Sequence, residues 1–328
     1  MDEKIRIGVA GYGNLGRGVE MAIARNPDMQ LVGVFSRRDP ASIELLTQAV
    51  PVHKFDDIEQ FRDQIDVLIL CGGSKNDLPE QGPALATLFN TIDSFDTHNK
   101  IPEYFAAMDS ASCVGERTSI ISVGWDPGVF SLNRLFGEAI LPEGETYTFW
   151  GKGLSQGHSD AIRRVPGVKA GVQYTIPSAE AMELVRSGSQ PQLSTREKHT
   201  RECHVVLEAG ADAKAVEHAI VSMPDYFADY DTTVHFISEE ELRSNHSAMP
   251  HGGFVIRSGQ TGDGSKQVIE YSLKLGSNPE FTAAVLVAYA RAAFRLHKKG
   301  VHGAHSVLDI APGLLSPKSP AQLRKELL

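Results

Sequence analysis

The feature that most constrains this chain lies in its first forty residues. An apolar run at residues 5–10 leads into the turn Gly11-Tyr12-Gly13-Asn14-Leu15-Gly16, and a helix-compatible stretch and a second apolar run follow at 15–26 and 30–35. In such a unit the first glycine makes the tight turn, the second lets backbone approach a pyrophosphate, and the third lets the helix pack on the strand. A glycine-rich surface turn is the alternative, but the flanking runs favour a βαβ unit that binds a dinucleotide at the helix N-terminus.

The residues after the second apolar run indicate which dinucleotide is bound. An NAD site carries an Asp or Glu about twenty residues beyond the glycines, where it binds the ribose 2′-hydroxyl. Here that region holds Ser36-Arg37-Arg38. A serine and two arginines suit a 2′-phosphate, so the pattern favours NADP, although a basic pair can also be a solvated turn.

Length and composition set further bounds. A chain of 328 residues is typical of two domains rather than one. It is 41% hydrophobic and 22% charged, and no apolar stretch reaches membrane-spanning length, so we expect a soluble enzyme without a membrane partner. The first strand begins almost at Met1, which leaves no room for a signal peptide, and we expect a cytoplasmic location. A net charge of −9 argues against a nucleic-acid partner.

Cysteines and histidines indicate neither a disulfide framework nor a metal centre. Cys71, Cys113 and Cys203 lie far apart without a Cys-x-x-Cys pattern, so we expect reduced thiols. His302 and His305 lie close together in a glycine-rich stretch but lack a third ligand. We therefore expect no metal cofactor.

Strand-like runs at 65–70, 91–95 and 118–123 continue the first domain, with helix-compatible segments between them. This alternation predicts an α/β fold with an open, doubly wound parallel sheet of the Rossmann type. Ligands of such sheets bind beyond the carboxyl ends of the strands. The polar loops after these runs should therefore converge on the nicotinamide end of the cofactor, with Asp96 and Asp126 as neighbours.

The pattern changes from about residue 144, where strand-like runs dominate over helices. This predicts a second, α+β domain with a mainly antiparallel sheet. The last two runs, joined across residues 261–265, predict a hairpin. Asn278-Pro279-Glu280 is a helix cap, a first-turn proline and an early acid, and it predicts an Ala-rich helix to about residue 298. The strand-like runs are at 146–150, 172–176, 204–208, 232–237, 254–258 and 268–275.

Longer motifs carry a resemblance to a known family. After the glycine turn come Gly124-Trp125-Asp126-Pro127-Gly128, the stretch from Phe149 to Asp160, Arg163-Arg164-Val165-Pro166-Gly167-Val168 and Met249-Pro250-His251-Gly252-Gly253. These motifs lie in order and are far more specific than a dinucleotide fingerprint. Over essentially its whole length, the sequence resembles the diaminopimelate dehydrogenase family.

The resemblance implies an NADP-dependent homodimer with two domains. A Rossmann domain at 1–123 would be completed by a C-terminal segment at 300–328, and a substrate-binding and dimerisation domain would span 124–299. The family reaction oxidatively deaminates the D-centre of meso-2,6-diaminopimelate to L-2-amino-6-oxopimelate and ammonia. The reverse reductive amination leads toward lysine and peptidoglycan precursors.

The resemblance also implies site residues. Contacts to NADP fall on the glycine turn, the basic triplet and three strand-end loops: Gly11, Tyr12, Gly13, Asn14, Leu15, Ser36, Arg37, Arg38, Cys71, Gly72, Gly73, Ser74, Ser94, Phe95, Asp96, Val123, Gly124, Trp125, Asp126 and Pro127. Contacts to the substrate fall on Asp96, Asp126, Trp150, Gln156, Thr175, Arg201, His251 and Asn278.

The chemistry of the substrate suggests roles for these residues, because it carries an ammonium and a carboxylate at each end. Asp96 and Asp126 are suited to accept hydrogen bonds from the reacting amino group and to stabilise the iminium cation, so we expect them to be catalytic. Arg201 offers a fork for the distant carboxylate. Taken alone, Trp150 would indicate core and Arg201 a surface ion pair. Asp96, Asp126 and His158 are candidates for activating water.

Three other functions stay open at this point. One is a broad-specificity, NADP-dependent D-amino acid dehydrogenase, and another is a reductase of a cyclic imine. The third is a cofactor-binding sensor that keeps the fold but has lost the chemistry, because fold does not imply function. Turnover of D-lysine as well as meso-diaminopimelate would identify the broad-specificity D-amino acid dehydrogenase. Any turnover would exclude the sensor.

Overall fold

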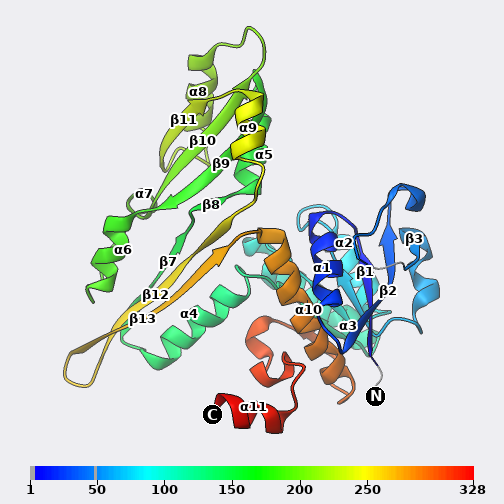
Figure 1. Ribbon diagram of the computed structural model, residues 1–328. Coiled ribbons are helices and arrows are strands. Elements are labelled where there is room, and N and C mark those ends of the chain that lie inside the picture. Colours follow the sequence, from blue (N-terminus) through cyan, green and yellow to red (C-terminus); the bar gives the residue numbers. More distant parts are fainter. Residues whose placement is uncertain (1–3, 48–49) are drawn as a thin grey trace. The chain divides into compact units, whose positions relative to one another are not determined.

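The chain is divided between two structural units (Figure 1). The computed structural model describes residues 4–47 and 50–328. Unit 1 contains residues 1–132 and 279–328, and unit 2 contains residues 133–278. The chain thus returns to unit 1 at Pro279, whereas the resemblance implied a return at residue 300.

Seven parallel strands form the centre of unit 1, in the order β14-β6-β5-β4-β1-β2-β3. Parallel sheets are covered on both faces, which is why the central strands β1 and β4 are mostly apolar and buried. The predicted doubly wound parallel sheet is therefore confirmed. The strands are β1 (Ile5–Ala10), β2 (Met29–Ser36), β3 (Val52–Lys54), β4 (Val67–Leu70), β5 (Thr91–Asp93), β6 (Thr118–Ile120) and β14 (Gly303–His305).

Helices pack on both faces of this sheet. The α-helices are α1 (Asn14–Ala24), α2 (Leu78–Ala86), α3 (Ile101–Val114), α10 (Asn278–His297) and α11 (Pro320–Leu327). The helices α1 and α10 share one buried cluster with Ile7 and Val9 of β1. The helices α2 and α3 share the other cluster with Leu68 and Leu70 of β4. Side chains from the two faces of the sheet thus enter two separate cores.

Unit 2 contains two sheets. The first is antiparallel, in the order β13-β12-β7, and the hairpin predicted across residues 261–265 is present as β12 and β13. The second has the order β11-β10-β9-β8, and its β10–β11 pair is parallel while its other pairs are antiparallel. The strands are β7 (Gly144–Trp150), β8 (Gly153–Leu154), β9 (Val168–Pro177), β10 (His199–Leu207), β11 (Asp231–Phe236), β12 (His251–Thr261) and β13 (Ser265–Leu275).

Short helices connect these strands, most of them begun by a capping side chain. Ser178 accepts a hydrogen bond from the backbone of Ala181 at the start of α6, and Asp212 does the same for α8. The helix α4 (Val129–Ile140) enters unit 2, where buried Arg257 donates to the carbonyls of Leu141 and Pro142 at its end. The others are α5 (Gln156–Arg163), α6 (Ala179–Arg186), α7 (Thr195–Lys198), α8 (Ala213–Val221) and α9 (Glu239–Asn245).

Candidate active site

The glycine turn lies between β1 and α1, as predicted. A Cβ atom on Gly16 would lie 2.3 Å from the carbonyl oxygen of Gly11, so only glycine allows this close packing of helix on turn. Gly13 is exposed, and a Cβ there would meet nothing within 4 Å. The backbone at Gly13 is therefore open to a ligand at the N-terminus of α1, as a pyrophosphate requires.

A buried carboxylate that no sequence motif predicted supports this turn. Glu20 of α1 is fully buried and accepts a hydrogen bond from the hydroxyl of Tyr12. It also accepts the backbone N–H groups of Leu46 and Thr47, at 3.0 and 2.6 Å. Burial and the adjacent carboxylate raise the pKa of Tyr12 to about 12, so its phenol stays a donor. Glu20 thus ties the glycine turn to the segment that follows β2.

The basic triplet borders a cavity of about 260 Å³ that also includes the glycine turn. Ser36 accepts the backbone N–H of Arg38 at 3.1 Å, and the Arg38 guanidinium donates to the carbonyl of Tyr12. Arg37 forms an ion pair with Asp77 at 2.9 Å and is otherwise largely exposed. An exposed glycine backbone and two cations at one cavity fit the pyrophosphate and 2′-phosphate of NADP.

The strand-end loops of unit 1 meet at the predicted edge of the sheet. The hydroxyl of Ser74, after β4, accepts the backbone N–H of Asp96, after β5, at 3.1 Å. Asp126 follows β6, which neighbours β5 in the sheet. Burial raises the pKa of Cys71 to about 12, so its thiol is not a nucleophile at neutral pH.

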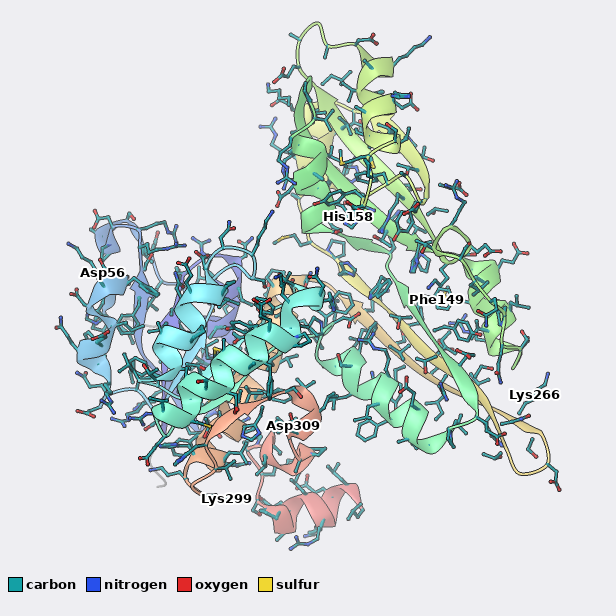
Figure 2. The ribbon with its side chains drawn as sticks, turned by 180° about the vertical axis from the view of Figure 1, so that it is seen from behind. Asp56, Phe149, His158, Lys266, Lys299 and Asp309 are labelled. Carbon is teal, nitrogen blue, oxygen red and sulfur yellow. The ribbon has the colours of Figure 1, made fainter. Side chains whose placement is uncertain are left out.

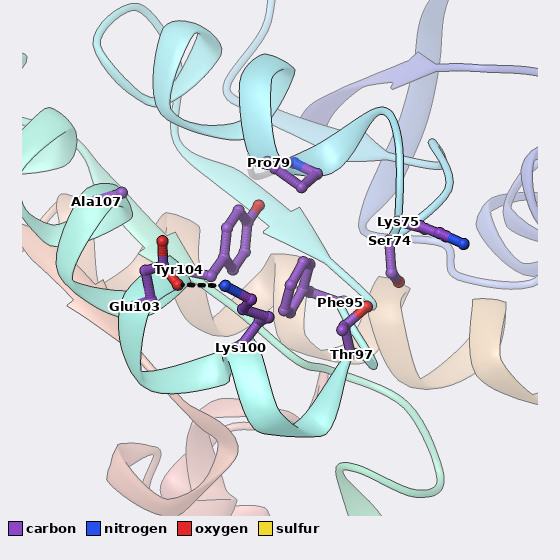
Figure 3. Close-up of a pocket in the computed structure, with 9 residues that line it drawn as sticks. All are labelled: Ser74, Lys75, Pro79, Phe95, Thr97, Lys100, Glu103, Tyr104 and Ala107. Carbon is purple, nitrogen blue, oxygen red and sulfur yellow. Dashed lines mark hydrogen bonds and ion pairs between the residues drawn. The ribbon is translucent and has the colours of Figure 1, made fainter. Parts of the chain in front are cut away.

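Several predicted cofactor residues have buried side chains. The Phe95 ring stacks on Tyr104 with 4.1 Å between centroids, and Val123 and Trp125 are also buried. These residues could therefore reach a cofactor mainly through their backbones. A second cavity of about 330 Å³ opens beside the same loops (Figure 3), lined by Ser74, Lys75, Pro79, Phe95, Thr97, Lys100, Glu103, Tyr104 and Ala107.

In unit 2, strand register brings predicted substrate residues into one row. Arg201 of β10 pairs with Thr175 of β9, and Thr175 pairs with Gly153 of β8. A Cβ on Gly153 would lie 2.5 Å from the ring of His251, so glycine leaves the space that the imidazole occupies. Asn278 joins this region through its backbone N–H, which donates to the carbonyl of Met249 at 3.0 Å.

Arg201 is the most unusual charge in this row. It is 6% exposed, and one of its guanidinium nitrogens donates to the hydroxyl of Thr175. Its guanidinium carbon lies 3.9 Å from the ring centroid of Tyr230, a residue that no sequence motif predicted. Its Nε has no hydrogen-bond partner, and no carboxylate pairs with it among the described residues. Buried Arg291 of unit 1, by contrast, is paired with Asp28 at 2.6 Å.

His199, which was not predicted from the sequence, contacts Trp150 and is influenced by the charge of Arg201. The indole is 37% exposed and stacks on the His199 ring with centroids 5.4 Å apart, and the Trp150 backbone N–H donates to His199 Nε2 at 2.8 Å. Burial and the charge of Arg201 lower the pKa of His199 to about 3, so the ring is neutral when it accepts this bond. The centroid of the Phe149 ring lies 6.0 Å from that of His199, and Phe149 is labelled in Figure 2.

The remaining candidates are placed less directly. Burial, and then Arg201, lower the pKa of His158 to about 4, so it is a weak proton acceptor at neutral pH; its Nδ1 lies 2.8 Å from the Ser155 hydroxyl. Gln156 begins α5, but its side chain lies outside the part of the chain that the structure describes. Among the described residues, no helix is long and apolar enough to cross a membrane.

A Rossmann-type unit whose basic triplet fits a 2′-phosphate, in one chain with an α+β unit whose buried Arg201 has no carboxylate partner among the described residues, defines a nicotinamide-dependent oxidoreductase of a small anionic substrate. Residues 124–277 match the family described as the diaminopimelic acid dehydrogenase C-terminal domain. A meso-diaminopimelate D-dehydrogenase from Ureibacillus thermosphaericus is 66% identical over 325 residues, which cover 99% of each chain. The chain belongs to the meso-diaminopimelate D-dehydrogenase family.

Solved structures of relatives agree with this assignment. A crystal structure of a meso-dapdh mutant with DAP, from Clostridium tetani E88, is 57% identical with a TM-score of 0.94, and it covers 99% of this chain and 100% of that one. An engineered D-amino acid dehydrogenase bound to NADP+ is 45% identical with a TM-score of 0.86, with the same coverage.

Proposed function

We propose that this chain is an NADP-dependent dehydrogenase that oxidatively deaminates the D-centre of meso-2,6-diaminopimelate to L-2-amino-6-oxopimelate and ammonia. The reverse reductive amination would serve lysine and diaminopimelate biosynthesis. The observation that carries the substrate assignment is Arg201, a buried guanidinium that lacks a carboxylate partner among the described residues. An uncompensated buried charge is costly, and the second carboxylate of diaminopimelate supplies the missing anion.

The substrate-binding residues in unit 2 would hold the distant, L-configured end. The Arg201 guanidinium, which lies over the Tyr230 ring and donates to the Thr175 hydroxyl, would bind the carboxylate of this end. Trp150 would form an apolar wall, stabilised by His199. The other members of this proposed set are Gln156, His251 and Asn278.

The mutant structure supports this set. The six residues replaced in the Clostridium tetani protein have the same types, the same order and the same spacing as six residues of this chain. Five of these six are in the substrate set derived from the resemblance, and Pro250 was not predicted. The six are Gln156, Thr175, Arg201, Pro250, His251 and Asn278.

The reacting end would lie at the strand-end loops of unit 1. We propose that Asp96 and Asp126 accept hydrogen bonds from the reacting amino group and stabilise the iminium cation that forms on the substrate. NADP, when bound, accepts the hydride. Attack of water on the iminium and loss of ammonia complete the oxidation. The amine must lose a proton before hydride transfer, so oxidation should be faster at alkaline pH.

We also propose that the protein is a homodimer and works in the cytoplasm. On the part of α4 that belongs to unit 2, Leu135, Phe136 and Ile140 are 42%, 43% and 60% exposed. An apolar stripe of this kind is typical of a protein–protein contact. Cys71, Cys113 and Cys203 are free thiols, which suits a reducing compartment.

The experiment that tests the function follows NADPH formation with meso-diaminopimelate, the LL isomer and D-lysine, each with NADP and with NAD, and measures ammonia in parallel. We expect turnover that is strongest with the meso isomer and NADP. Equal turnover of D-lysine would favour the broad D-amino acid dehydrogenase. Absence of turnover with every pair would contradict the proposal.

An arginine variant tests the substrate assignment more directly. The change Arg201→Met should lower kcat/KM for meso-diaminopimelate by about 10- to 100-fold, because it removes a charge-assisted contact to the distant carboxylate. D-lysine lacks that carboxylate, so its kcat/KM should change much less. The matched control is Arg196→Ala, which removes an arginine that is half exposed and paired with Asp231. An equal loss for both substrates would contradict the role of Arg201.

A further inference from the structure

A single buried carboxylate lies at the point where the two loops with the proposed catalytic aspartates begin. Asp93 is the last residue of β5 and is fully buried. Its Oδ1 accepts the backbone N–H of Phe95 at 3.0 Å and that of Ser122 at 3.1 Å. Its own carbonyl oxygen accepts the backbone N–H of Val123 at 2.9 Å. Asp93 thus holds both the segment that follows β5 and the segment that follows β6.

Each of these bonds holds a segment that leads directly to a proposed catalytic residue. Phe95 immediately precedes Asp96. Ser122 begins the loop that carries Asp126, and its φ of 56° is in the left-handed region that non-glycine residues rarely adopt. The Ser122 hydroxyl is buried and has no hydrogen-bond partner within residues 4–47 and 50–328. The bond from its N–H to Asp93 is therefore a main restraint on this unusual backbone conformation.

Tyr104 of α3 fixes the orientation of the Asp93 carboxylate. Its hydroxyl donates to Asp93 Oδ2 at 2.9 Å, and its ring stacks on Phe95 at an interplanar angle of 16°. A Cβ on Gly82 would lie 2.2 Å from this hydroxyl, so glycine in α2 leaves the space that the phenol occupies. Tyr104 and Phe95 form neighbouring parts of the cavity wall in Figure 3.

We propose that Asp93, oriented by Tyr104, is a positioning residue that sets the loops of Asp96 and Asp126 relative to each other. This inference rests on the proposed function, which assigns those two aspartates to the reacting end of the substrate. Burial raises the pKa of Asp93 to about 6, so the group is an ionised acceptor at the neutral and alkaline pH at which oxidation would be measured. Its hydrogen-bond partners are two backbone amides and one phenol, with no cation among them.

The test compares Asp93→Ala and Asp93→Asn. Alanine removes all the side-chain bonds, and we expect kcat for meso-diaminopimelate to fall about 10- to 100-fold, as for a misplaced catalytic group. NADP affinity should fall less than kcat, because the glycine turn and Arg37, which would bind the phosphates, line a cavity that does not include Asp93. Asparagine keeps an oxygen for both backbone amides and can donate to Tyr104, so it should restore most of kcat. An Asp93→Ala variant that folds and keeps the wild-type kcat would overturn the proposal.

The matched control is Asp66→Ala. Asp66 also holds a backbone amide, that of Arg6 at 2.8 Å, but it lies at the amino ends of the strands. We expect its removal to leave kcat close to the wild-type value. A loss of kcat equal to that of Asp93→Ala would assign the effect to general weakening of unit 1 and overturn the positioning role.

Amide hydrogen exchange gives a readout that does not depend on the reaction. We expect Asp93→Ala to speed exchange in segments 94–97 and 121–125, and Asp66→Ala to leave both unchanged. If the wild type turned over no diaminopimelate, the proposed function would fail, and unchanged exchange in both segments would separately overturn the role of Asp93. If Asp93→Ala did not fold, Tyr104→Phe would replace it. That variant should lower kcat and speed exchange in both segments, and no change in either would overturn the proposal.

Discussion

Arg37 is the side chain whose removal should separate the two nicotinamide cofactors. It borders the cavity beside the glycine turn and pairs with Asp77. The change Arg37→Ala should weaken NADP binding by about 1.5 to 3 kcal/mol, the value of a hydrogen bond to a charged group, and should spare NAD. Fluorescence titration with both cofactors measures this. Arg25→Ala, at an exposed position outside the cavity, is the control. Equal losses for both cofactors would refute a contact to the 2′-phosphate.

Titration of Asp93 should also contribute to the pH dependence of the free energy of unfolding. Burial raises its pKa from 3.8 to about 6, so the folded protein binds this proton more tightly than the unfolded chain. The stabilisation is complete below about pH 4 and is lost as the pH rises through about 6. Between about pH 4.5 and 7.5, the free energy of unfolding of the wild type should therefore fall by about 2 kcal/mol relative to that of Asp93→Asn. Urea denaturation at both pH values measures it.

The control for that comparison is Asp263→Asn, in the exposed turn between β12 and β13. Its difference from the wild type should be the same at both pH values. A pH-independent difference for Asp93→Asn as well would show that its carboxylate does not titrate in this range.

At the scale of elements, Arg291 joins α10 to two other segments of unit 1. It is 1% exposed, bonds Asp28 at 2.6 and 2.8 Å, and donates to Asn26 and to the carbonyl of Leu315. The hydrogen bond from Arg291 lowers the pKa of Asp28. The stabilisation from this pair is therefore present above the ordinary pKa of Asp28 and is lost as the pH falls through its lowered value.

The change Arg291→Met should lower the free energy of unfolding of unit 1 by about 3 kcal/mol, because it leaves Asp28 and a carbonyl without their partner. Scanning calorimetry at neutral pH measures the effect. Arg196→Ala, which breaks a more exposed ion pair with Asp231, should cost less than about 1 kcal/mol. A similar small cost for Arg291→Met would contradict the structural role of this pair.

The sequence predicted those elements that its periodicity marks. Each strand of the parallel sheet from β1 to β6 except β3 lies in an apolar or strand-like run, and the 261–265 turn marks the hairpin. No such run marks β14, which has three residues. The helices α6 and α8 were missed although Ser178 and Asp212 are recognisable caps, because the strand pattern around them was stronger.

The site was predictable only in part, for a physical reason. The glycine turn and the basic triplet are local patterns, and the substrate residues came from the family resemblance. Glu20, His199 and Tyr230 act through partners that register or packing brings near, such as Leu46, Trp150 and Arg201. No spacing in the sequence marks such contacts.

At the scale of the whole molecule, the proposed homodimer predicts that one substitution can dissociate it into monomers. The change Phe136→Asp places a charge in the exposed apolar stripe of α4 and should convert a dimer into a 35.6-kDa monomer. Sedimentation equilibrium measures this. The control is Val114→Asp, at an apolar residue of unit 1 that is 78% exposed. A wild type that sediments as a monomer would refute the dimer, and a dimeric Phe136→Asp would place the interface elsewhere.

During synthesis, unit 1 begins first but is completed last, after all of unit 2 has been made. Unit 2 is one continuous segment, whereas unit 1 also needs residues 279–328, which include all of α10 but its first residue, and all of β14. A ribosome therefore releases all of unit 2 while the edge of β6 that β14 later covers is still unpaired. The nascent protein passes through a stage with one finished unit and one open parallel sheet, the stage at which chaperone capture or edge-to-edge aggregation competes with folding.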